Sequence, residues 1–163
     1  MSRIYYTTME SPVGSLRLVA EELGLRMVWF VRGRKEEKPD AEWKEDVAFF
    51  VEVIRQLNAY FAGELREFEI PLLMLGTEFQ KRVWKALLTI PYGETMSYGE
   101  LAKKIGEPKA VRAVGAANGQ NPIPIIVPCH RVIGSDGSLT GFGGGLENKK
   151  KLLELESRQR RLL

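Results

Sequence analysis

Cys129 and His130 are the residues whose types most directly suggest chemistry, because each is the only one of its kind in the 163-residue chain and the two are neighbours. Taken singly, a cysteine after an apolar run is usually a small buried hydrophobe, and a lone histidine is usually structural or exposed. Taken together, a thiol within reach of an imidazole base is the minimum equipment of an activated sulfur nucleophile. Neighbouring residues of an extended segment point to opposite faces, so adjacency alone does not establish contact. The pair therefore indicates nucleophilic chemistry only with support from the rest of the chain.

The sequence around this pair supplies that support. An apolar run, residues 123–127, leads into it, and Pro128 restricts the backbone that presents the thiol. Three short motifs follow one another at a characteristic spacing: Arg112-Ala113-Val114-Gly115, Asn121-Pro122 and Pro128-Cys129-His130-Arg131. In these motifs the chain closely resembles the O6-alkylguanine-DNA alkyltransferases, the methylated-DNA–protein-cysteine methyltransferases that repair alkylated guanine.

The resemblance implies a catalytic group of four residues. The residue matching Cys129 accepts the alkyl group from O6 of guanine, and the residue matching His130 removes the thiol proton through a water molecule. Glu156 falls where the family places the carboxylate that orients the histidine, and Tyr98 falls where it places a donor that stabilises the leaving guanine. The thioether product has no route back, so each molecule is expected to act once, without a cofactor.

Double-stranded DNA containing O6-alkylguanine is the partner that the resemblance implies, bound by a monomer. In the family the residue matching Arg112 enters the base stack in place of a flipped-out nucleotide, and the residue matching Tyr98 helps to rotate the target phosphate. Flipping is needed because O6 of guanine does not reach a buried thiol from inside a duplex. Small residues of the same segment permit close backbone approach, either to another helix or to a minor groove: Ala113, Gly115, Ala116 and Ala117.

The resemblance also implies a pocket for the flipped base. The glycine-rich loop 140–145 forms one of its walls, with Phe142 flanking the guanine. This loop lacks the Gly-Lys-Ser/Thr ending of a P-loop, which argues against nucleoside triphosphate binding. Asn121 matches a hinge that ties the helix to the cysteine segment, although Asn at a helix end is also an ordinary cap. The residues assigned to substrate binding are Asn121, Val132, Phe142, Gly143 and Gly144.

The composition is that of a globular protein, with 44% hydrophobic and 28% charged residues. No apolar segment approaches the roughly 20 residues needed to cross a bilayer, and the first residues do not resemble a signal peptide. We therefore expect a cytoplasmic protein with no membrane partner. One cysteine and one histidine leave no Cys/His zinc site and no internal disulfide, so no metal is expected. The net charge of +3 favours a polyanionic partner without requiring one.

Residues 1–76 are expected to form a scaffold domain made of a sheet and a helix. The charged stretch Arg32–Pro39 predicts a solvated loop, and apolar residues at helical spacing predict a helix from Trp43 to about Gly63. Nothing in this half could perform chemistry. An antiparallel meander is predicted by three segments of strand character: Ile4–Thr8, Ser15–Ala20 and Leu25–Val31.

Residues 77–163 are expected to form the DNA-binding and catalytic domain, with a helix-turn-helix or winged-helix-like arrangement. Capping boxes at Thr77–Gln80 and Ser97–Glu100 predict two helix starts. Gly106-Glu107-Pro108 predicts a tight turn, followed by a helix over Lys109–Asn118 with Pro108 in its first turn. On local pattern alone such a pair is more often ordinary helical packing than a DNA reader. With a last helix over 146–163, the fold class predicted for the chain is α+β.

Two other functions are compatible with parts of the sequence. A non-enzymatic DNA-binding protein, either a helix-turn-helix regulator or an alkyltransferase-like lesion binder, would bind without chemistry. The lesion binders resemble this family but lack the nucleophilic cysteine, which is present here as Cys129. A cysteine hydrolase using Cys129 and His130 would turn over, yet it leaves Arg112 and the helix-turn-helix pattern unexplained. The alkyltransferase accounts for most of the sequence.

Overall fold

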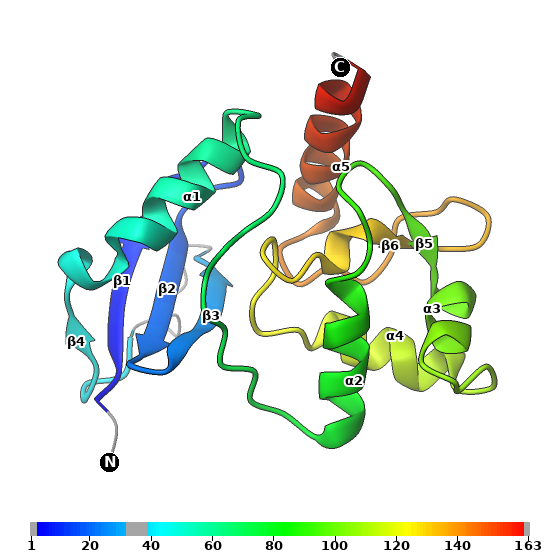
Figure 1. Ribbon diagram of the computed structural model, residues 1–163, viewed down its shortest axis with the longest axis horizontal. Coiled ribbons are helices and arrows are strands. Elements are labelled where there is room, and N and C mark those ends of the chain that lie inside the picture. Colours follow the sequence, from blue (N-terminus) through cyan, green and yellow to red (C-terminus); the bar gives the residue numbers. More distant parts are fainter. Residues whose placement is uncertain (1–2, 32–38, 162–163) are drawn as a thin grey trace. The chain divides into compact units, whose positions relative to one another are not determined.

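The computed structural model describes residues 3–31 and 39–161, which divide between Met74 and Leu75 into two compact units. Each unit has its own core and combines strands with helices (Figure 1). The prediction of an α+β fold is confirmed. The predicted loop Arg32–Pro39 lies outside the described residues, apart from Pro39.

The N-terminal unit is built on a four-stranded sheet in the order β3-β2-β1-β4. β1 (Tyr5–Met9) pairs antiparallel with β2 (Leu16–Glu21), and β2 pairs antiparallel with β3 (Gly24–Phe30). These three strands confirm the predicted meander. The inward side chains of β2 are fully buried, so the alternation of apolar residues positions the sheet against its covering helix.

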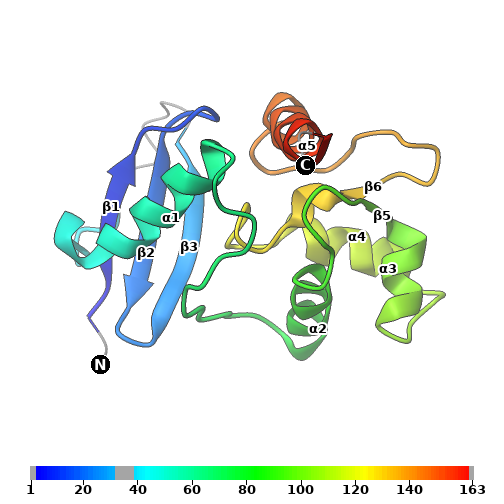
Figure 2. The ribbon, with the colours of Figure 1, turned by 45° about the horizontal axis from the view of Figure 1, so that its top comes forward.

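That helix begins later than the sequence predicts. A 3₁₀ turn, η2 (Val47–Phe50), leads into α1 (Val51–Phe61), which lies across one face of the sheet in both views (Figures 1 and 2). Its buried face carries Phe50, Leu57 and Tyr60. The end predicted near Gly63 is correct to within two residues.

The residues before η2 are extended rather than helical, so the predicted start at Trp43 is wrong. Lys44–Glu45 form β4, which pairs parallel with β1. The Lys44 amide donates to the Ile4 carbonyl at 2.9 Å, and the Asp46 amide donates to the Tyr6 carbonyl at 3.0 Å. The open edge of β1 offers backbone partners that an isolated first helical turn lacks, and this tertiary pairing overrides the helical spacing.

The C-terminal unit starts its first two helices where the sequence predicts them. α2 (Glu78–Leu87) begins at a complete capping box, in which Thr77 Oγ1 accepts from the Gln80 amide at 3.1 Å and Gln80 Oε1 accepts from the Thr77 amide at 2.9 Å. α3 (Tyr98–Lys104) begins at the second box, formed by Ser97 and Glu100. Each box satisfies two amides that a helix start leaves without partners, which fixes both helix starts.

The helix that carries Arg112 differs from the prediction at its start. α4 spans Val111–Gly119, and Pro108 lies in a separate turn that is closed by the Ala110 amide on the Glu107 carbonyl at 2.9 Å. The prediction that Pro108 occupies the first turn of this helix is therefore wrong. The predicted three-residue turn is also wrong, because residues 105–110 separate α3 from α4. Trp84 Nε1 donates to the Ala117 carbonyl at 2.8 Å and fixes α4 against α2.

The remaining elements surround the cysteine. β5 (Met96–Ser97) pairs parallel with β6 (Val132–Ile133), and the 3₁₀ turn η3 (Cys129–Arg131) lies immediately before β6. α5 (Leu146–Arg161) packs against η3. Over the part of the chain that the structure describes, no helix is both long enough and apolar enough to span a membrane.

The first capping box gives a direct test of how the C-terminal unit is built. We expect Thr77→Ala to lower the free energy of unfolding of this unit by about 1 kcal/mol, because it removes the acceptor for the Gln80 amide. Urea unfolding followed by tryptophan fluorescence measures the change. Thr77→Ser is the matched control, since it keeps the hydroxyl and should unfold close to the wild-type midpoint. Equal losses for both variants would contradict a capping role.

Candidate active site

The cysteine is presented by a short buried segment whose backbone is tightly constrained. Ile125 has a φ of 75°, a left-handed conformation that costs a β-branched residue on the order of 1–3 kcal/mol and persists only where its surroundings impose it. Pro128, with φ −81° and ψ 65°, forms an inverse γ-turn closed by the Cys129 amide on the Val127 carbonyl at 2.8 Å. Residues 123–132 are all buried, so the thiol lies in the interior of the unit.

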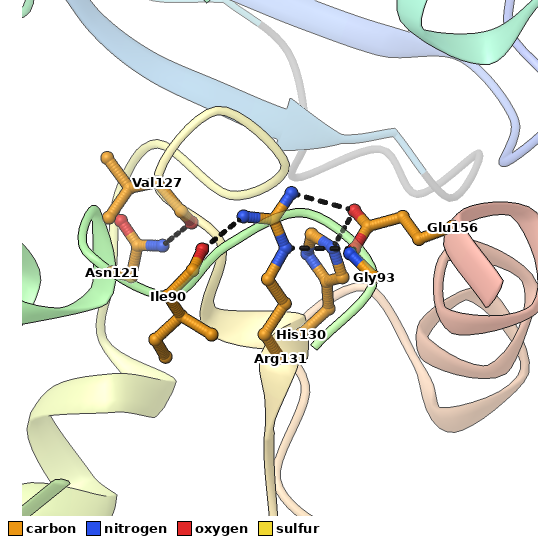
Figure 3. A network of polar contacts seen from close by, with 7 residues as sticks. All are labelled: Ile90, Gly93, Asn121, Val127, His130, Arg131 and Glu156. Carbon is orange, nitrogen blue, oxygen red and sulfur yellow. Dashed lines mark hydrogen bonds and ion pairs between the residues drawn. The ribbon is translucent and has the colours of Figure 1, made fainter. Parts of the chain in front are cut away.

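Asn121 ties this segment to the end of α4. Its Nδ2 donates to the Val127 carbonyl at 2.8 Å (Figure 3). Its Oδ1 accepts from the Ile123 amide at 3.0 Å. Asn118, inside α4, adds a longer contact of 3.4 Å from its Nδ2 to the Cys129 carbonyl. The two amide side chains therefore couple the helix that carries Arg112 to the backbone of the cysteine segment.

The Cys129 thiol is 5% exposed and is protonated at neutral pH. Burial raises the pKa of Cys129 to about 11, although a hydrogen bond from Asn121 and the charge of Lys149 act in the opposite direction. A neutral thiol is a weak nucleophile, so reaction requires removal of its proton by a base. The nearest imidazole in sequence, His130, is the candidate base.

His130 is fully buried and fixed by Glu156. The His130 Nε2 to Glu156 Oε2 distance is 2.7 Å. Burial lowers the pKa of His130, while the hydrogen bond and charge of Glu156 oppose this effect. A neutral imidazole bonded to a carboxylate carries its hydrogen on the bonded nitrogen, which leaves Nδ1 as an acceptor. Nδ1 makes no hydrogen bond to the residues that the structure describes, as suits a nitrogen that takes up a proton during reaction.

Arg131 completes the polar network around Glu156. Its Nε donates to Glu156 Oε1 at 2.8 Å and its Nη2 donates to Glu156 Oε2 at 3.0 Å, a bidentate arrangement (Figure 3). The Gly93 amide donates to Oε1 at 3.2 Å. Burial alone would raise the pKa of Glu156, but the hydrogen bonds and charges of His130 and Arg131 outweigh it and hold the pKa below its ordinary value. The carboxylate is therefore ionised at neutral pH.

Lys149 is a buried cation that the sequence analysis missed. Its side chain is 0% exposed, and Nζ donates to the Val132 carbonyl at 2.6 Å and to the Thr140 carbonyl at 2.9 Å. Among the described residues it forms no ion pair, and burial lowers its pKa. Lys149 precedes Glu156 by seven residues, two helical turns, so its position on the buried face of the last helix was the available signal.

Tyr98 packs between α4 and the glycine-rich loop. Its hydroxyl donates to the Thr140 carbonyl at 3.2 Å and lies 3.3 Å from Thr140 Oγ1. A side chain added at Gly115 would meet the Tyr98 ring at 3.7 Å, so Gly115 faces this ring. Ala117 is buried, so of the two alternatives for the small residues helix packing describes Ala117, while Gly115 is half-buried beside the Tyr98 ring. Tyr98 lies outside the hydrogen-bond network of His130 and Glu156.

One side of α4 is exposed, and its one charged residue lies near the start of the helix. Arg112, Ala113 and Ala116 are exposed, with Gly119 further along the same side. Apart from the Arg112 side chain, the residues on this side are small, so a partner could approach the helix backbone closely. Arg112, Ala113 and Ala116 therefore share an accessible surface, as minor-groove contact would require.

The residues expected to bind the base have mixed environments. Val132 is fully buried and Phe142 is 9% exposed, whereas Gly143 is exposed with open space beside its Cα. The Gly144 carbonyl accepts from Asn148 Nδ2 at 2.9 Å, which fixes the loop to α5. A cavity of about 310 Å³ in this unit is lined by Glu156 and by none of the five residues assigned to substrate binding.

The N- and C-terminal units match two family models. Residues 4–74 match the ribonuclease-like domain of the 6-O-methylguanine DNA methyltransferases, and residues 78–158 match their DNA-binding domain. The chain belongs to this family. No group of three or more His, Cys, Asp or Glu side chains that could hold a metal ion occurs among residues 3–31 and 39–161.

Individual members of the family are similar over nearly the whole chain. A methylated-DNA–protein-cysteine methyltransferase of Methanosarcina acetivorans is 58% identical over 154 residues, which are 94% of this chain and 98% of the relative. The crystal structure of Mycobacterium tuberculosis OGT in complex with DNA has a TM-score of 0.88 and 54% identity, covering 95% of this chain and 94% of that one. The methyltransferase of the archaeon Pyrococcus kodakaraensis has a TM-score of 0.60 at 26% identity, covering 94% and 98%.

The raised pKa of the single thiol predicts a loss of stability at alkaline pH. Because the folded protein holds the thiol proton more strongly, this contribution is fully present below the ordinary thiol pKa of 9.0 and is lost as pH rises through about 11. We expect the free energy of unfolding to fall by about 1 kcal/mol between pH 8 and pH 10 from this source. Urea unfolding at both pH values measures the loss. Cys129→Ala should lack this loss, and an equal loss in that variant would contradict the assignment.

Proposed function

We propose that the protein repairs DNA by transferring a methyl group from O6 of guanine to Cys129, as a methylated-DNA–protein-cysteine methyltransferase. The observation that carries the proposal is that Cys129, His130 and Glu156 are buried together. The His130 imidazole is hydrogen-bonded to the Glu156 carboxylate at 2.7 Å, which leaves its Nδ1 able to accept a proton. The names of relatives that are more than half identical over nearly their full length support the same activity.

The chemistry is a single displacement in which every proton and electron pair has a destination. Nδ1 of His130 takes the proton of the Cys129 thiol, by way of a water molecule, and Glu156 stabilises the imidazolium that forms. The sulfur electron pair forms the S–CH₃ bond as the bond between the methyl carbon and O6 breaks. The electron pair of that bond leaves with guanine, which takes up one proton. His130 returns the proton it removed from the thiol to water, so the net reaction moves one proton from the thiol to the base. The thioether has no leaving group, so the protein acts once.

Tyr98 is proposed as the donor that stabilises the leaving guanine. Its hydroxyl bonds to Thr140 in the free protein, so it must exchange this partner for the base before it can donate. A hydrogen bond from a phenol is strengthened as negative charge develops on the guanine, which is when the donor is needed.

DNA is the proposed partner, and its target base is proposed to be flipped out of the stack. The structure of the M. tuberculosis relative in complex with DNA supports DNA as the partner. We propose that Arg112 fills the space of the flipped base while Ala113 and Ala116 approach the minor groove. All these residues belong to the C-terminal unit, so a monomer is sufficient. We place this activity in the cytoplasm.

Intact-mass measurement of the protein incubated with a duplex carrying one O6-methylguanine tests the transfer. We expect a gain of one methylene equivalent per molecule, located on the peptide containing Cys129, because this is the only thiol. Cys129→Ala should gain no mass and still bind the duplex. Binding without any gain in the wild-type protein would favour the non-enzymatic lesion binder, and turnover without modification would favour the hydrolase.

The role of Arg112 is tested by comparing duplex DNA with a free base. We expect Arg112→Ala to slow methyl transfer from the duplex by tenfold or more, while transfer from free O6-methylguanine stays near the wild-type rate, because no base has to be displaced. Lys109→Ala, a neighbouring exposed cation before α4, is the control for a general loss of charge. Equal slowing on both substrates, or by both variants, would overturn the role in flipping.

A further inference from the structure

Two side chains could neutralise the one buried carboxylate at the centre of the site. Glu156 is 1% exposed, and it contacts both the His130 imidazole and the Arg131 guanidinium, which are 0% and 6% exposed. A buried carboxylate needs a compensating charge, because leaving it unpaired is strongly unfavourable. Either a protonated His130 or Arg131 could supply that charge, and the two choices leave His130 in opposite protonation states.

The geometry favours Arg131. Its guanidinium meets both carboxylate oxygens, at 2.8 and 3.0 Å, whereas His130 meets one oxygen. Two parallel hydrogen bonds in the planar fork make the strongest pairing available to a carboxylate, and arginine does not lose its charge in proteins. With this pair formed, protonating His130 would add a second buried cation beside one anion.

We propose that Arg131 is a positioning residue for methyl transfer, because its ion pair with Glu156 supplies the counter-charge and so keeps His130 neutral, with its hydrogen on Nε2 and Nδ1 ready to accept the thiol proton. This proposal rests on the proposed function, in which His130 is the base. In this role Arg131 acts through Glu156 and does not contact the substrate or the reacting atoms.

The guanidinium is held in place by contacts other than Glu156. Its Nη1 donates to the Ile90 carbonyl at 2.6 Å, and its carbon lies 5.7 Å from the centre of the Tyr92 ring (Figure 3 shows the Ile90 contact). Both contacts come from the segment between α2 and β5. The cation therefore stays at the carboxylate without help from His130.

The other charged and titratable groups around His130 act in the same direction. From α5, Lys149 adds a buried positive charge that lowers the pKa of His130, as Arg131 does. The Cys129 thiol next to it is neutral at physiological pH and adds no charge. The Tyr92 ring lies against the Arg131 guanidinium. Glu156 is the one anion that the described residues place in contact with the imidazole, and Arg131 already neutralises it.

Nuclear magnetic resonance of the imidazole gives a direct test, because His130 is the only histidine and contributes one set of nitrogen signals. In the wild-type protein at pH 7 we expect a neutral ring with hydrogen on Nε2 and an unprotonated Nδ1, unchanged on acidification to below pH 6.5. A protonated Nδ1 at pH 7 in the wild-type protein would overturn the proposal, whatever the variants do.

Two variants of the same ion pair should affect the protonation of His130 differently. In Arg131→Gln, the carboxylate loses its counter-charge and the His130–Glu156 pair takes up a proton, so the pH at which Nδ1 becomes protonated rises by about one to three pH units. If that proton is on the ring, both ring nitrogens carry a hydrogen. If it is on the carboxyl group, the carboxyl group donates to Nε2 and the ring hydrogen lies on Nδ1. Nδ1 therefore carries a hydrogen in both cases. In Glu156→Gln, no such rise occurs, and in the double variant the rise is abolished. Arg55→Gln, which removes an exposed arginine paired with Glu52 in the N-terminal unit, is the matched control.

The pH dependence of methyl transfer separates this proposal from a purely structural role. At neutral pH we expect Arg131→Gln to react about tenfold or more slowly than wild type, with the rate recovering toward the wild-type value as pH is raised. A variant that is only misfolded or loosened would not regain rate at higher pH. A rate reduced equally at every pH, with an unshifted Nδ1 titration, would overturn the proposal. If the wild-type protein transferred no methyl group at all, the proposed function would fail while the imidazole measurement would still decide the role of Arg131.

Discussion

The buried negative charge of Glu156 sets the conditions under which the C-terminal unit folds and works. Glu156 belongs to the last helix, α5. Its carboxylate accepts hydrogen bonds from the turn at Gly93 and from His130 and Arg131 in the cysteine segment. Breaking such a buried pair by removing one partner costs on the order of 3–5 kcal/mol, so the three segments stabilise one another. The bonds that fix the His130 ring are thus the same bonds that hold the segments together.

The backbone before Cys129 is constrained in an unusual conformation. Ile125 adopts a left-handed conformation and Pro128 forms a γ-turn, so the chain reverses direction twice within a few buried residues. Asn121 supports this path by bonding to both ends of it, at Ile123 and Val127. A stiff support of this kind keeps the sulfur in one place, which matters for a reaction whose single displacement requires an aligned approach.

The sequence predicts the parts of the fold that depend on local interactions. Both capping boxes and the meander follow from side chains a few residues apart, and they form as predicted. The misassigned elements depend on distant partners. Lys44–Glu45 extends because the edge of β1 is available, and α4 starts at Val111 because Pro108 is used in a turn.

The same distinction applies to the site. The resemblance located the residues that carry the motifs, but it could not show how buried cations are arranged around them. The burial of Lys149 and the pairing of Arg131 with Glu156 are visible only when the last helix lies against the cysteine segment. The direction of Gly115, toward the Tyr98 ring, likewise depends on how α3 and α4 pack, and no spacing in the sequence encodes it.

The carbonyl of Thr140 accepts from both the Tyr98 hydroxyl and the Lys149 ammonium group. A carbonyl oxygen has two lone pairs, and the bond from Lys149 satisfies it when Tyr98 leaves. Moving the phenol therefore forfeits one partly exposed hydrogen bond, worth about 1 kcal/mol, and creates no unsatisfied buried group. The bonds from Lys149 and Asn148 still anchor the loop to the last helix when the Tyr98 bond is broken.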